Sequence, residues 1–141
     1  MAGFFVIRFP ELLSLLFLLA GCASEPLRSI GLDKLSPRKA EQELSAGLRS
    51  YEDGNYKAAS RYLQNAVDAG LAFKSDQVTA HKYLAFIHCA SDREKLCRDE
   101  FKRVLELNPK FELTPAEEGH PVWGPAFRGV QVEMQNIKAK K

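Results

Sequence analysis

Apolar residues recur at intervals of three and four positions through most of the chain after residue 36. The first such stretch contains Leu44, Leu48 and Tyr51. Residues at this spacing lie on one face of an α-helix, whereas a half-buried strand would alternate at every second position. Turn-forming pairs separate the stretches, at Asp53-Gly54, Ala69-Gly70 and Asn108-Pro109. The sequence therefore predicts an all-α fold of helices joined by short turns.

The start and stop signals divide this part of the chain into helices. We expect helices over 37–52, 56–69, 76–90 and 92–107, a short turn of helix over 115–118, and a last helix reaching the end of the chain. Three helix-start signals support these ranges: Ser36-Pro37, a capping box at Ser91 to Glu94 and another at Thr114 to Glu117. We expect the last helix to cover the preceding hairpin, with Trp123 and Phe127 as its apolar anchors.

Small and aromatic residues in the first two helices match the spacing of a tetratricopeptide repeat. They are Gly47, Tyr51, Gly54, Tyr56, Ala59, Leu63 and Ala66. The equivalent positions 38 residues later hold Ala85, Cys89, Asp92, Glu94, Cys97, Phe101 and Val104, with Pro109 at the terminal proline position. A repeat unit is about 34 residues, so we expect the four extra residues in the loop around 69–75. In the second repeat, Asp92 and Glu94 replace the turn glycine and an aromatic residue.

This resemblance implies a short tetratricopeptide-repeat solenoid, with two hairpins over residues 37–110. Three or more repeats are usual, since each buries its apolar face on a neighbour. Residues 111–141 are therefore expected to supply a C-terminal capping segment and helix. The alternative is a generic helical bundle.

The amino terminus has an apolar run that is short for a membrane span. Nine residues, Leu12–Ala20, would extend about 14 Å as a helix, against a bilayer core of about 30 Å. Arg8, Pro10 and Glu11 interrupt the sequence upstream. A run of this length is typical of a secretory signal peptide.

The segment Leu19-Ala20-Gly21-Cys22 resembles the signal of bacterial lipoproteins. The resemblance implies that residues 1–21 are removed and that Cys22 receives acyl chains such as palmitate, which anchor the protein. Ala23 after the cysteine implies the outer membrane, with the protein facing the periplasm. Residues 22–36 are then a lipid-anchored, flexible tether. The alternatives are an ordinary signal peptide and a buried apolar segment with an incidental cysteine.

Charge and motifs exclude several function classes. The formal net charge of +2, from 20 basic and 18 acidic residues, argues against a nucleic-acid binder with a broad basic face. The sequence contains no GxSxG, P-loop, HExxH or CxxC motif. We therefore predict a non-enzymatic protein with no cofactor.

The two remaining cysteines are predicted to form a disulfide. Export would place Cys89 and Cys97 in an oxidising compartment, and a tight antiparallel turn would bring their Cα atoms within bridging distance. The alternatives are two buried thiols and a redox-active pair. His81 and His88, with Cys97, are also candidate zinc ligands, but their spacing matches no common zinc pattern. We predict core imidazoles and no metal site.

In tetratricopeptide proteins, the first helix of each hairpin lines a concave face that binds peptides or partner helices. By that resemblance the partner-binding residues are Glu41, Leu44, Leu48, Tyr51, Lys82 and Phe86. We expect Phe86 to be an open aromatic anchor, so that Phe86→Ala weakens binding without unfolding the domain. The alternative is that Leu44, Leu48 and Tyr51 belong partly to the core.

The region from Tyr51 to Arg128 resembles the small lipoproteins associated with type VI secretion gene clusters, the TssQ-like family. The resemblance is carried by YLAFIHCASDREKLCRDEFKRVLELNPKFELTPAEEGHPVWGPAFR. It implies an accessory, non-enzymatic role in secretion, with protein partners bound to the repeats and a lipid anchor in the membrane. The rival functions are a scaffold lipoprotein for outer-membrane or cell-wall assembly, and a periplasmic thiol or zinc protein. The sequence leaves the oligomeric state open.

Overall fold

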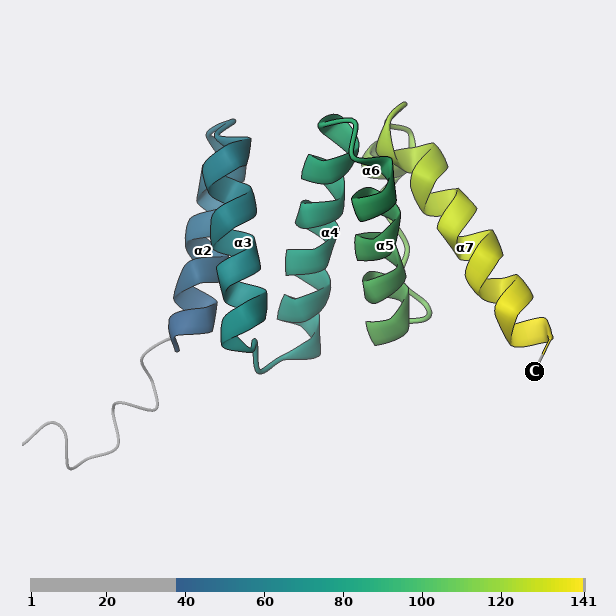
Figure 1. The fold of residues 1–141 in the computed structure, drawn as a ribbon, viewed down its shortest axis with the longest axis horizontal. Helices are drawn as coiled ribbons and strands as arrows, with labels where there is room; N and C mark the ends of the chain where they lie inside the picture. The colour runs from purple at the N-terminus through teal and green to yellow at the C-terminus, as the bar shows by residue number, and fades with distance from the viewer. Residues whose placement is uncertain (1–37, 141) are drawn as a thin grey trace, which may run out of the picture. The chain divides into compact units, whose positions relative to one another are not determined.

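The computed structural model describes residues 38–140, which form six α-helices and no strand (Figure 1). The helices are α2 (Lys39–Glu52), α3 (Tyr56–Ala69), α4 (Lys74–Ala90), α5 (Glu94–Leu107), α6 (Pro115–Glu118) and α7 (Trp123–Ala139). The predicted all-helical fold is confirmed. The expected signal peptide over 1–21, the lipid attachment site Cys22, the tether over 22–36 and the Ser36-Pro37 start signal lie outside the described residues.

Local side-chain contacts explain where several helices begin. The Asn55 side chain accepts a hydrogen bond from the backbone N–H of Ala58 (3.2 Å) and so caps α3. The predicted capping box of α6 is confirmed, because Thr114 and Glu117 each accept a hydrogen bond from the other's backbone N–H. Helix α4 starts at Lys74, two residues before the predicted position.

The capping box predicted at Ser91 is wrong. Ser91 instead follows the last residue of α4, and its hydroxyl donates a hydrogen bond to the carbonyl of Ile87 (2.7 Å). Arg93 is the residue before α5 and gives no side-chain cap. The serine therefore closes one helix rather than opening the next, because its hydroxyl bonds back along α4.

The helices pack in the order in which they occur along the chain. Helices α2 and α3 form one hairpin and α4 and α5 a second; α4 packs on α3 and also contacts α2. Helix α7 packs on α5 and contacts α4, but it runs parallel to α5, whereas α4 runs antiparallel to α3 (Figure 1). It therefore covers the second hairpin without having the direction that the first helix of a third hairpin would have.

Helices α2, α4 and α7 lie closer to one another along the array than α3 and α5 do. Helix α4 contacts both α2 and α7, whereas the structure has no contact between α3 and α5 within residues 38–140. We call α2, α4 and α7 the inner row, because α4 approaches both α2 and α7 while α3 and α5 do not approach each other. This arrangement is compatible with a helical repeat.

Equivalent positions of the two hairpins have matching environments. A Cβ added to Gly47 would lie 2.8 Å from Cγ of Leu63, so the small residue permits close helix packing. Gly54 and Asp92, 38 residues apart, both have positive φ, at 75° and 55°. The left-handed backbone suits glycine and is tolerated by aspartate. The 38-residue register of the sequence is thus kept in three dimensions.

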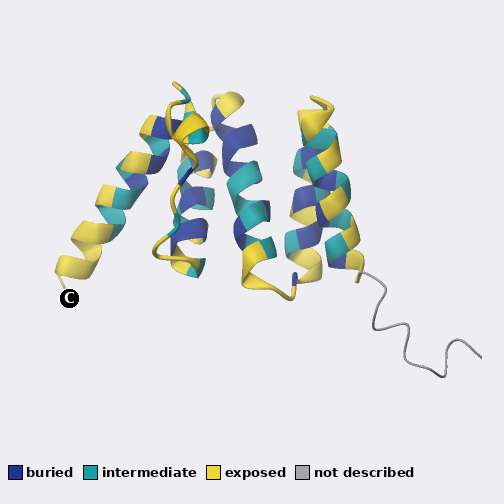
Figure 2. Ribbon diagram, turned by 180° about the vertical axis from the view of Figure 1, so that it is seen from behind, coloured by how far each residue is buried: buried dark blue, intermediate teal, exposed yellow. Residues whose placement is uncertain are grey.

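The buried residues form two clusters, one between the first hairpin and α4 and one among α4, α5 and α7; the buried positions are marked in Figure 2. The first cluster centres on Leu63 and Leu84, and the second on Phe101 and Phe127; all four are at most 2% exposed. The Phe127 ring of α7 lies 5.1 Å from the Phe101 ring. Burying a side chain of this size stabilises the fold by about 1.5–3 kcal/mol. The predicted anchoring of the last helix through Phe127 is confirmed.

Candidate functional site

The face of the first hairpin that α2 forms, which we call its inner face, is partly buried in the core and partly exposed. Leu44 is buried, whereas Leu48 and Tyr51 are half-buried and pack at the edge of the first cluster. The Tyr51 ring makes edge-to-face contacts with Tyr56 (5.3 Å) and Tyr83 (4.7 Å). Burial, together with these neighbouring phenols, raises the pKa of Tyr51 to about 12. Leu48 and Tyr51 therefore form an apolar surface held in place by packing.

Glu41 lies at the start of α2, against the loop between α3 and α4. One carboxylate oxygen is 3.5 Å from the backbone N–H donor of Ala72 and 3.9 Å from Nε of Arg38. The other oxygen is buried and has no hydrogen-bond partner in the described residues. The contacts present make Glu41 a support for this loop.

Lys82 is bound by a residue that the sequence did not indicate. Its Nζ lies 2.6 Å from Glu117 of α6, and it also lies over the rings of Tyr83 and Phe86. Burial opposes ionisation of Glu117, but hydrogen bonds from Lys82 and Thr114 outweigh it and lower the pKa of the carboxyl. Helix α6 is thus fastened to the inner face of α4.

Phe86 is not the open aromatic anchor that was expected. It is only 3% exposed, because the Trp123 ring stacks on it at 4.6 Å, while Phe101 contacts it from α5. His120 stacks in turn on Trp123. The chain's own segment 117–123 therefore covers the inner face of the second hairpin, and Phe86 belongs to the core.

The two cysteines predicted to pair lie together at the turn of the second hairpin. The Cα atoms of Cys89 and Cys97 are 5.0 Å apart, within the usual range for a bridge, and their sulfur atoms are at disulfide distance. Both residues are buried. The predicted proximity is confirmed, and the pair links α4 to α5.

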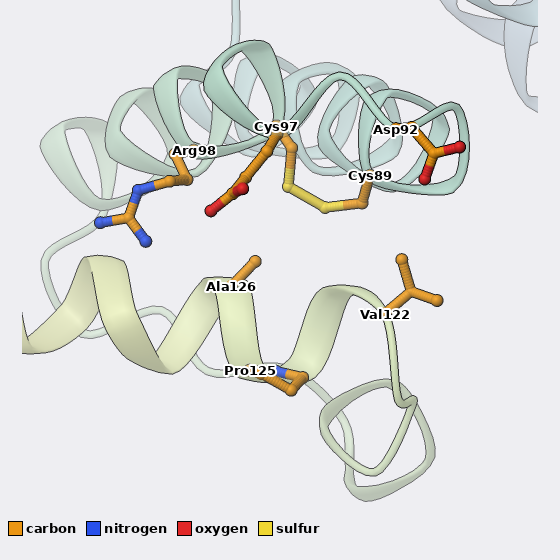
Figure 3. A pocket seen from close by; sticks show the side chains of 8 residues that line it. Cys89, Asp92, Cys97, Arg98, Val122, Pro125 and Ala126 are labelled. Atoms are coloured by element: carbon orange, nitrogen blue, oxygen red, sulfur yellow. A yellow bond between two sulfur atoms is a disulfide. The ribbon is translucent and has the colours of Figure 1, made fainter.

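A cavity of about 560 Å³ lies beside the cysteine pair, between the second hairpin and the start of α7 (Figure 3). Its lining consists of Cys89, Asp92, Glu94, Cys97, Arg98, Val122, Pro125 and Ala126. It brings together acidic, basic and apolar side chains from three segments. Among the features of the sequence, only the atypical residues at positions 92 and 94 of the second repeat point to it.

The two histidines considered as zinc ligands have other environments. His81 Nδ1 lies 2.6 Å from Oε2 of Glu100, which joins α4 to α5. His88 is 7% exposed, and burial, with nearby Arg93, lowers its pKa. The buried imidazole predicted for His88 is confirmed. Within residues 38–140 no three His, Cys, Asp or Glu side chains are grouped to hold a metal ion.

Comparisons with known proteins yield no relative: no family model matches the chain, and no curated protein or solved structure is significantly similar to it. Within the described part of the chain, none of the helices is both long and apolar enough to cross a membrane.

Proposed function

We propose that this protein is an adaptor that binds protein segments on the inner face of its first hairpin. The observation that supports this most is the contrast between the two hairpins. Leu48 and Tyr51 of α2 remain partly exposed, while the corresponding face of α4 is covered by Glu117 and Trp123. A partly open apolar face on a rigid helical scaffold suits a partner helix or extended peptide.

The interpretation of the fold as tetratricopeptide repeats supports the same proposal. The 38-residue spacing within the sequence, the positive φ at Gly54 and Asp92, and the inner row of α2, α4 and α7 fit a short repeat array closed by α7. In such an array Glu41, Leu44, Leu48, Tyr51 and Lys82 line or support the binding face. Phe86 is buried and supports the binding face through packing.

The amino-terminal sequence supports a proposal for the location. We propose that Cys22 carries the lipid, that the protein is held at the outer membrane facing the periplasm, and that it serves a type VI secretion apparatus as an accessory component. Its resemblance to the TssQ-like lipoproteins supports the last point.

Site-specific photo-crosslinking tests the adaptor function. A photoreactive phenylalanine analogue replaces Leu48 in the lipidated protein, in cells with the secretion genes intact or deleted. We expect a defined crosslinked partner from the secretion apparatus, which is lost in the deletion strain. The same analogue at exposed Gln64 of α3 is the matched control. Equal crosslinking from both positions, or a product that persists in the deletion strain, would contradict the proposal.

Lipid attachment is tested separately. Cys22→Ser should abolish incorporation of labelled palmitate and release the protein from the membrane fraction, because a single thiol is the proposed attachment point. Continued labelling of the variant would show that the anchor lies elsewhere.

A further inference from the structure

A second cavity, of about 230 Å³, lies between the start of α3 and the end of α4. The turn that leads into α5 closes it on one side. Its lining consists of Tyr56, Lys57, Ser60, Ile87, Ser91 and Arg93. None of the residues assigned to the inner face of the first hairpin lines this cavity, so it is a separate space that the proposed function does not use.

Two cationic side chains line this second cavity, and neither has an acidic partner. Lys57 and Arg93 are exposed, and no carboxylate lies within ion-pair distance of either in the described part of the chain. The lining contains no acidic residue: Asp53 is not part of it, and Asp92 and Glu94 line the cavity beside the cysteine pair instead. An anionic group placed here would therefore gain two cationic neighbours without breaking an existing ion pair.

Hydroxyl groups add further hydrogen-bond donors to the same cavity. The side chains of Tyr56 and Ser60 make no hydrogen bond to another described residue, so both O–H groups are available to an acceptor. The Ser91 hydroxyl already donates to the carbonyl of Ile87 (2.7 Å). A carboxylate has only acceptor atoms, so it matches a lining that offers N–H and O–H donors.

The cavity also has an apolar part. Ile87 lines it from α4 and is 3% exposed, while Tyr56, which is 50% exposed, lines it from α3. A hydrocarbon stem can pack on these two side chains, whereas a bare inorganic ion has no apolar surface to bury there. The lining therefore favours an acid that is carried on an aliphatic stem.

We propose that this cavity binds an acidic side chain, aspartate or glutamate, of a protein partner. The carboxylate lies between Lys57 and Arg93 and accepts hydrogen bonds from Tyr56 and Ser60, and the methylene groups pack on Ile87. The inference rests on the proposed adaptor function only in taking the acid to belong to a protein. Because the cavity and the inner face of the first hairpin share no residue, the two can be tested independently.

Three small probes test this proposal on the full chain. N-acetylglutamate N-methylamide carries the acidic side chain, its glutamine analogue has nearly the same shape without the charge, and dimethyl phosphate is a singly charged phosphodiester. Binding is followed by changes in the amide NMR signals of Lys57, Ser60 and Arg93. We expect the glutamate derivative to bind about four- to 25-fold more tightly than the glutamine analogue, because it gains two exposed ion pairs, and dimethyl phosphate to bind less tightly than the glutamate derivative.

Substitutions of the two cations show whether they cause the preference. Lys57→Gln and Arg93→Gln should each weaken binding of the glutamate derivative about two- to fivefold, and the double variant should bind it about as weakly as the glutamine analogue. Both side chains are exposed, so the unfolding curves should match that of the wild type. Lys74→Gln is the matched control, since Lys74 is an exposed lysine in the first turn of α4 and does not line the cavity; it should leave all affinities unchanged.

The proposal is overturned if the glutamate and glutamine derivatives bind equally, if the double variant keeps the full preference, or if neither probe shifts the cavity signals. Tighter binding of dimethyl phosphate than of the glutamate derivative would also overturn it, because the site would then be one for phosphodiesters such as lipid headgroups. Any of these results with crosslinking from Leu48 retained would reject this site and leave the adaptor function standing. A carboxylate preference without crosslinking from Leu48 would reject the adaptor function and leave an acid-binding cavity.

Discussion

At the scale of single residues, Phe86 shows how much a neighbour far along the chain alters the role of a side chain. The tetratricopeptide resemblance predicts an exposed binding residue at this position, yet Trp123 stacks on Phe86 and leaves it 3% exposed. Its ring also contacts Tyr83 and Phe101. The side chain therefore contributes to stability, and its substitution is a test of packing rather than of partner binding.

We predict that Phe86→Ala lowers the free energy of unfolding by about 3–5 kcal/mol, because it removes a buried ring and leaves a cavity. Denaturant unfolding followed by circular dichroism measures the change. Phe73→Ala is the matched control, since Phe73 is 64% exposed. The control should change stability by less than about 0.5 kcal/mol. Similar values for the two variants would mean that Trp123 does not cover Phe86 in solution.

His88 should make stability depend on pH. Its pKa is lowered in the fold by burial and by Arg93, with Glu100 opposing, so the folded protein binds a proton less readily than the unfolded chain, whose histidine pKa is 6.5. The contribution of the neutral imidazole is therefore full above about pH 6.5 and is lost as the pH falls below it. The slope is at most about 1.4 kcal/mol per pH unit.

The measurement is the unfolding free energy of wild type and His88→Gln between pH 8 and pH 5. We expect the stability of the wild type to fall more steeply below pH 6.5 than that of the variant, and the difference to be constant above it. Parallel curves over the whole range would show that His88 does not titrate differently in the folded and unfolded states.

At the scale of secondary-structure elements, the turn between α4 and α5 is the part most altered from the first repeat. Asp92 has the positive φ that glycine adopts at Gly54, and Ser91 bonds back to Ile87 rather than capping α5. The cysteine pair crosses the hairpin beside this turn. We infer that it compensates for a turn whose own residues are less suited to the backbone.

Removing the pair with the double substitution Cys89→Ala, Cys97→Ala should therefore lower the unfolding free energy by about 2–3 kcal/mol, the chain-entropy value for so short a loop. Alanine fits position 97 because Ala59 holds the equivalent place and both are fully buried. Thermal unfolding with and without a phosphine reductant measures the effect. Wild type should respond to the reductant and the variant should not; equal responses would mean that no bridge forms.

At the scale of the whole described molecule, α7 acts as the terminal cap. It packs on α5 and contacts α4, and its Phe127 and Val130 are buried in the second cluster. Ion pairs from Arg98 and Lys102 of α5 to Glu133 of α7 add contacts at the edge of the interface between these helices. Those charged groups lie near the surface, so the apolar burial supplies most of the stabilisation.

A chain ending at Lys110 should consequently lose cooperative unfolding and bind a hydrophobic dye, because Phe86 and Phe101 would be uncovered. Removal of residues 138–141 is the matched control, since Lys138, Ala139 and Lys140 are exposed. This shorter deletion should preserve the wild-type unfolding curve. A cooperative transition in the longer truncation would show that the two hairpins are stable without their cap.

Patterns in the amino-acid sequence were enough to predict the helices, their order, the 38-residue spacing and the closeness of Cys89 to Cys97. Each of these depends on contacts between neighbours in the chain or on a regular period. The burial of Phe86, the pairing of Lys82 with Glu117 and the cavity at Glu94 were decided only by the tertiary structure. The spacing of apolar residues identifies the apolar face of a helix. It does not show which segment covers that face, because the covering segment here is an irregular stretch far along the chain.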